Sequence, residues 1–121
     1  MIEFVDTHTH LFTAEFDSDR ADAVQRAVDA GVGTLCLPAI NEETLPALMA
    51  MCDAFPGICY PMIGLHPTEL GDDYNSVLDR LYNLLKSDDR FVAIGEVGRP
   101  RSSRTSSITF FQKVCSTTSS R

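Results

Sequence analysis

Short apolar runs alternate along this chain with segments whose apolar residues recur every three or four positions. The runs predict strands over residues 2–6, 32–37, 58–65 and 91–95. The segments between them predict helices over residues 17–30, 41–54 and 72–86. Strands that alternate with helices at a repeat of roughly 25–33 residues are typical of βαβ units. The pattern therefore predicts an α/β fold with a parallel sheet and right-handed crossovers.

Turn-forming residues suggest where these elements begin and end. Asp17 or Ser18 is expected to cap the first helix and Asn41 the second, because short polar side chains accept hydrogen bonds from free backbone N–H groups. Pro61 lacks a backbone N–H and is expected to interrupt the third strand. These residues set the boundaries that a structure can test.

The length limits how much of such a fold the chain can hold. It has 121 residues, whereas a complete (β/α)8 barrel needs roughly 200 residues or more. We therefore expect a partial (β/α)8 TIM barrel, about its first four βα units, over residues 1–98. Its open inner face and the free edge of its fourth strand are expected to favour aggregation, or pairing with another half-barrel, and to leave five apolar positions partly exposed. These are Val5, Leu35, Leu37, Ile63 and Ile94.

The character of the sequence changes after Gly98. Residues 99–121 contain seven Ser, four Thr and no acidic residue. They show no sustained helical period, and Pro100 stands where a fourth helix would begin. We expect an irregular, mobile tail. Its composition suggests that it is an atypical segment, for example an out-of-frame or alternative sequence.

Charge and cysteine content exclude some classes of protein. The net charge is −7, and all 17 acidic residues lie at or before Glu96. An acidic body does not grip nucleic acid through a broad basic face, so a phosphodiester substrate would need metal ions for positive charge. No C-x-x-C pair, secretory signal or membrane-spanning run is found, and we expect a cytoplasmic protein. Its thiols are expected to be reduced: Cys36, Cys52, Cys59 and Cys115.

The strongest chemical signal is the motif Asp6-Thr-His-Thr-His10. Residues two apart in an extended chain point to the same side, so His8 and His10 can aim two imidazoles at one metal ion. In a parallel barrel the active site lies at the carboxyl ends of the strands, where this motif falls. Asp6 could orient the histidines or act as a weak ligand. The alternative is a pair of surface histidines on a loop.

Two further motifs follow the third and fourth strands. Gly64-Leu-His-Pro67 places His66 at a carboxyl end, and Gly64 permits a close backbone approach. His66 is a candidate catalytic residue that would hydrogen-bond a substrate oxygen. Glu96, between two glycines in Gly95-Glu-Val-Gly98, can bridge two cations and is a candidate metal ligand and catalytic residue. The alternatives are that His66 is a structural histidine and that Glu96 is a solvent-exposed glutamate on a loop.

In their order and spacing, these three motifs resemble the TatD family of metal-dependent deoxyribonucleases over residues 1 to about 98. The resemblance implies a TIM barrel, two divalent metal ions of the Mg, Mn or Zn class, and DNA as substrate. It implies that His8 and His10 ligate one metal, that Glu96 is the bridging carboxylate, and that His66 faces the substrate. D-x-H-x-H alone is shared with amidohydrolases and PHP-type phosphoesterases.

The sequence departs from the family at its end. The family supplies two His and one Asp from later strands, but no His follows His66 and no Asp follows Asp89 here. Arg99-Pro-Arg101 stands where the family usually has an apolar residue and an Asp. We therefore expect an incomplete, inactive form of the enzyme. The alternatives are another amidohydrolase-superfamily hydrolase and a non-catalytic truncated isoform.

Overall fold

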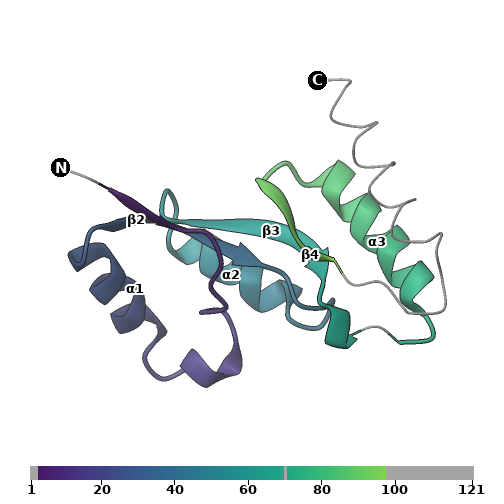
Figure 1. Ribbon diagram of the computed structural model, residues 1–121, viewed down its shortest axis with the longest axis horizontal. Coiled ribbons are helices and arrows are strands. Elements are labelled where there is room, and N and C mark those ends of the chain that lie inside the picture. Colours follow the sequence, from purple (N-terminus) through teal and green to yellow (C-terminus); the bar gives the residue numbers. More distant parts are fainter. Residues whose placement is uncertain (1–2, 70, 98–121) are drawn as a thin grey trace.

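The computed structural model describes residues 3–69 and 71–97, which form a four-stranded parallel sheet in the order β1-β2-β3-β4. The strands are β1 Phe4–Asp6, β2 Val32–Pro38, β3 Cys59–Leu65 and β4 Ala93–Val97. The helices are α1 Arg20–Asp29, α2 Leu45–Ala54 and α3 Tyr74–Ser87, with short 3-10 turns at Ala14–Phe16 and Pro67–Glu69. Strand order follows chain order, with α1 on the β1 side and α3 on the β4 side (Figure 1). This half-barrel confirms the expected fold class.

The helices begin later than the capping residues indicated. α1 starts after Asp19, whose side chain makes no capping hydrogen bond. The carboxylate of Asp17 instead accepts a hydrogen bond from Arg20 at 2.7 Å. Asn41 Oδ1 accepts from the backbone N–H of Thr44 at 2.9 Å. Asn41 thus stabilises the turn that precedes α2 rather than its first helical residue.

Pro61 lies inside β3, so the expected interruption of that strand is wrong. Pro61 pairs with Leu37 of β2 in the ladder. On the other side, its carbonyl accepts a hydrogen bond from Val92 N–H at 3.0 Å. The chain therefore uses the acceptor that proline retains and needs no donor at this position.

The core lies between the sheet and its helices. Leu35, Leu37 and Ile63 are at most 1% exposed, which corrects the expectation that they would face an open barrel interior. They point toward the helices: Leu35 and Leu37 pack with the α1 and α2 core, and Ile63 packs with the α3 core. Val5, at 55% exposed, and Ile94, which is half-buried, are partly exposed as expected.

The opposite face of the sheet carries the alternate residues. Cys36 and Met62 are half-buried there, and a Cβ at Gly95 would lie 2.9 Å from Cβ of Pro38.

No described helix is long and apolar enough to cross a membrane. The expectations for residues 99–121, including the absent fourth helix, and for Cys115 lie outside the described residues. Cys36, Cys52 and Cys59 have free thiols.

Candidate metal centre

The loop after β1 brings His8 and His10 to the carboxyl edge of the sheet. Asp6 Oδ1 accepts a hydrogen bond from the backbone N–H of His8 at 3.0 Å, and Thr9 N–H donates to the Cys36 carbonyl at 3.1 Å. The second bond ties the loop to β2. Asp6 therefore orients the backbone of the motif, and it is not among the side chains that converge at the centre.

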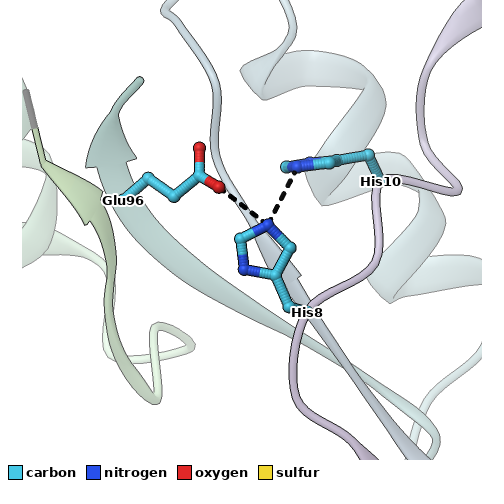
Figure 2. A group of neighbouring side chains, drawn as sticks. All are labelled: His8, His10 and Glu96. Carbon is cyan, nitrogen blue, oxygen red and sulfur yellow. Dashed lines mark hydrogen bonds and ion pairs between the residues drawn. The ribbon is translucent and has the colours of Figure 1, made fainter. Parts of the chain in front are cut away.

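Three side chains meet at this edge. Nε2 of His8 lies 3.2 Å from Nε2 of His10 and 2.7 Å from Oε1 of Glu96. Figure 2 shows both imidazoles and the carboxylate turned toward the same space, with Glu96 arriving from β4. One potential ligand atom from each residue lies within 4.8 Å of the other two. The sequence predicted this group, and the fold brings Glu96 to His8 and His10, which lie 88 and 86 positions earlier in the chain.

Glycine at position 64 allows Glu96 to reach this place. A Cβ built on Gly64 would lie 2.1 Å from the backbone oxygen of Glu96, which is far inside van der Waals contact. The register between β3 and β4 also shifts between Ile63 and Leu65. The absence of a side chain on β3 therefore lets the Glu96 backbone pass close to it.

Burial favours the neutral form of His10, which is the form of imidazole that can bind a metal ion. Its pKa is lowered first by burial and then by the neighbouring His8 ring, so the neutral imidazole that binds cations is favoured. The fully buried Phe12 meets the His10 ring edge-on, with ring centroids 5.8 Å apart. This contact holds the imidazole beside the apolar core.

At the centre, the buried Oε2 of Glu96 makes no aligned hydrogen bond among the described residues, although Nε2 of His66 lies 2.9 Å from it. A buried acceptor without a partner is costly, and a bound cation would satisfy the carboxylate. Two imidazoles and one carboxylate are also a donor set that suits divalent transition metals. The side chains present therefore fit a divalent cation.

His66 joins the centre from the end of β3. Its backbone N–H donates to the Ile40 carbonyl at 2.8 Å, which anchors it to the loop after β2. Its Nε2 lies 2.9 Å from Oε2 of Glu96, close but not aligned as a hydrogen bond. His66 is outside the group of three that could share one ion. It borders the centre, where a substrate-facing residue was expected.

Arg20 was missed at the sequence level. Its guanidinium donates to three successive backbone carbonyls of the loop that follows His10, at distances of 2.7–3.2 Å, and to Asp17. The three acceptors belong to Leu11, Phe12 and Thr13. Arg20 thus clamps the histidine loop onto α1. Because its partners in that loop are main-chain atoms, no side-chain motif could have indicated this role.

Comparison with known families agrees with this half-barrel fold. The family model described as TatD related DNase matches residues 5–118, so the chain belongs to the TatD family. The match continues beyond residue 98 into the Ser/Thr-rich segment that composition set apart. The atypical origin of that segment stays a prediction.

Several relatives carry names that describe hydrolases or nucleases. The chain is 33% identical over 96 residues to the uncharacterized metal-dependent hydrolase YjjV of Escherichia coli, and the aligned segment covers 78% of this chain and 37% of the relative. It is 32% identical over 104 residues to human deoxyribonuclease TATDN3, covering 80% and 38%. It is 30% identical over 93 residues to the 3'-5' ssDNA/RNA exonuclease TatD of Pectobacterium carotovorum, covering 77% and 35%.

The crystal structure of Escherichia coli YjjV superposes with a TM-score of 0.67 at 28% sequence identity. The superposition covers 93% of this chain and 42% of the other. The chain thus spans about two fifths of the length of the relatives it matches. The shared fold is that of the N-terminal part of a TatD-family barrel.

Proposed function

We propose that His8, His10 and Glu96 bind a divalent cation, and that this site serves hydrolysis of DNA phosphodiester bonds in a TatD-family enzyme. The observation that carries the proposal is the convergence of two imidazoles and one carboxylate within 4.8 Å at the carboxyl edge of a parallel sheet. The names of the relatives support the nuclease activity and a nucleic-acid substrate.

In this proposal each residue has a separate task. His8 and His10 offer neutral ring nitrogens to the ion, and Glu96 offers a carboxylate that can bridge two ions. His66 directs Nε2 toward the same space and would donate a hydrogen bond to a substrate oxygen. Two divalent ions of the Mg, Mn or Zn class, when bound, would lower the pKa of a water and neutralise charge on the phosphate.

The charge of the chain supports a role for metal ions in binding DNA. All its acidic residues lie at or before Glu96, so the described part of the molecule is strongly acidic. Such a body repels a polyanion, and cations at the centre would supply the local attraction. A cytoplasmic location is part of the proposal and is supported by the free thiols of Cys36, Cys52 and Cys59.

Calorimetric titration of the purified chain with Mn²⁺ or Zn²⁺ tests the site. Three protein ligands leave a metal incompletely held, so we expect weak binding that the double variant His8→Ala, His10→Ala abolishes. Glu96→Gln is expected to weaken binding by about tenfold or more, because the amide carries no charge.

Glu15→Gln is the matched control. It makes the same chemical change at an exposed position on the 3-10 turn Ala14–Phe16, and Glu15 is not in the group of three that could share an ion. Its affinity should equal that of the unmodified chain. Submicromolar affinity that survives the double histidine substitution would show that the ions bind elsewhere.

A further inference from the structure

The ring of His66 is held from the side opposite Glu96. Its Nδ1 accepts a hydrogen bond from the backbone N–H of Thr68 at 3.1 Å. The Thr68 hydroxyl lies 2.7 Å from the same nitrogen. On the other side of the ring, Nε2 lies 2.9 Å from Oε2 of Glu96. Nδ1 is therefore hydrogen-bonded by Thr68, and Nε2 faces the centre.

The two nitrogens of a neutral imidazole cannot play the same part, because one carries the proton and the other a lone pair. A backbone N–H is always a donor, so the nitrogen that faces it must present its lone pair. A hydroxyl can rotate to donate or accept, and it adapts to this choice. Nδ1 of His66 is thus the acceptor, and the proton resides on Nε2.

We propose that Thr68 is a positioning residue that fixes His66 as its Nε2–H tautomer, so that His66 serves as an N–H donor to anionic groups rather than as a metal ligand. To bind a metal through Nε2, the ring would have to move its proton to Nδ1. That proton would then face the Thr68 N–H at 3.1 Å, donor against donor.

The backbone around His66 keeps this arrangement in place. His66 N–H donates to Ile40, and the His66 carbonyl accepts from Glu69 N–H at 2.9 Å across the 3-10 turn Pro67–Glu69. The turn presents the N–H of residue 68 to the ring two positions earlier. The arrangement of Thr68 and the His66 ring is therefore formed within one turn of the chain and needs no substrate or ion.

The consequence for the centre rests on the proposed metal site. An Nε2–H group beside Oε2 of Glu96 leaves Oε1 and the two other histidines as the place for a first cation. It also presents a hydrogen-bond donor next to that cation, where a phosphate oxygen of a substrate would lie. Metal ligation and anion recognition would then belong to different histidines.

Long-range ¹H–¹⁵N NMR correlation on the metal-free 121-residue chain reads the tautomer directly. We expect His66 to show the Nε2–H pattern. In Thr68→Pro the backbone N–H that faces Nδ1 is lost, and the Nδ1–H fraction should rise about 2–10-fold, as expected for loss of one ordinary hydrogen bond. Thr68→Val loses only the hydroxyl, which adapts to either tautomer, and it keeps the backbone N–H, so it should match the original chain. A dominant Nδ1–H pattern in the original chain, or no change in Thr68→Pro, overturns the proposal.

Mn²⁺ titration separates this inference from the proposed function. His66→Gln keeps an amide N–H near the position of Nε2, and it should bind Mn²⁺ within about twofold of the original chain. A loss as large as that in Glu96→Gln would make His66 a ligand and overturn the assignment. If neither the original chain nor any variant binds Mn²⁺, the proposed function fails. The NMR pattern still decides the tautomer of His66 in that case.

Discussion

Gly64 is the residue on which the approach of β4 to the centre depends most directly. An alanine there would place its Cβ against the backbone oxygen of Glu96, and the strands would have to separate. We expect Gly64→Ala to destabilise the fold by about 1–3 kcal/mol, as overpacking does. It should also weaken Mn²⁺ binding, because Glu96 moves away from His8. Urea unfolding and calorimetry measure the two effects.

Gly57→Ala is the contrasting variant. Gly57 has a φ of 79°, and no atom lies within 4 Å of its virtual Cβ. Alanine there is strained by the backbone conformation alone. Its stability should fall while its Mn²⁺ affinity stays unchanged. Equal effects of the two variants on affinity would mean that Gly64 acts only through stability.

Arg20 makes a second residue-level prediction. A lysine has one compact ammonium and cannot reach the carbonyls of Leu11, Phe12 and Thr13 together. We expect Arg20→Lys to lose about 2 kcal/mol of stability, within the range for hydrogen bonds to charged groups. Mn²⁺ affinity should also fall, because the loop that carries His10 is released.

Arg26→Lys provides the control on the same helix. Arg26 is exposed and lies 3.8 Å from Asp19, a weak surface pair. Thermal unfolding of this variant should match that of the original chain. If Arg26→Lys and Arg20→Lys lower the thermal unfolding midpoint equally, the hydrogen bonds from Arg20 to the histidine loop contribute no more stability than the surface pair of Arg26.

At the level of elements, α3 is tied to the turn before α2 by one bidentate ion pair. Arg80 donates through Nε and Nη2 to the two oxygens of Glu42, both at 2.7 Å. The hydrogen bond from Arg80 lowers the pKa of Glu42 below its ordinary value of 4.5. The stability that this pair contributes is therefore present above pH 4.5 and is lost as the pH falls through the lowered pKa.

Urea unfolding of Arg80→Gln at several pH values checks this dependence. The variant should be modestly less stable than the original chain at pH 7, since exposed pairs contribute little. The difference should shrink as the pH falls below 4.5 and Glu42 becomes protonated. Arg26→Gln, which breaks a longer pair, should show no such trend. A difference that is constant with pH would contradict the assigned cause.

The sequence predicts which helices and strands form better than it predicts which of their faces are buried or at which residues they begin and end. The alternation of strands and helices, and the period of two that joins His8 and His10, are local and can be read from neighbouring residues. The orientation of Leu35 and Leu37 cannot be predicted from neighbouring residues, because strands covered on both sides are apolar throughout. Arg20 and Thr68 were missed because they bind backbone atoms or a ring that only the folded loop brings near.

At the scale of the whole molecule, the chain spans about two fifths of its relatives, and its 121 residues hold only three histidines. We predict no measurable nuclease activity for the purified 121-residue chain. Activity should appear when a TatD-family C-terminal portion, with the later ligands that the family supplies, is joined to it. Metal-dependent cleavage of single-stranded DNA by the short chain, abolished by Glu96→Gln, would show that three ligands suffice.

The last prediction concerns the free edge of the sheet. Among the strands that the structure describes, β1 pairs only with β2, and its side chains Phe4 and Val5 are 59% and 55% exposed. An exposed apolar edge strand favours pairing with other chains. We expect the purified chain to self-associate as its concentration rises, and Val5→Lys to suppress this with little change in unfolding midpoint. Val28→Lys places the same charge on an exposed apolar site of α1 and should leave association unchanged. Sedimentation velocity over a concentration series distinguishes the variants. A monomer at every concentration, or equal suppression by both lysines, would exclude β1 as the associating edge.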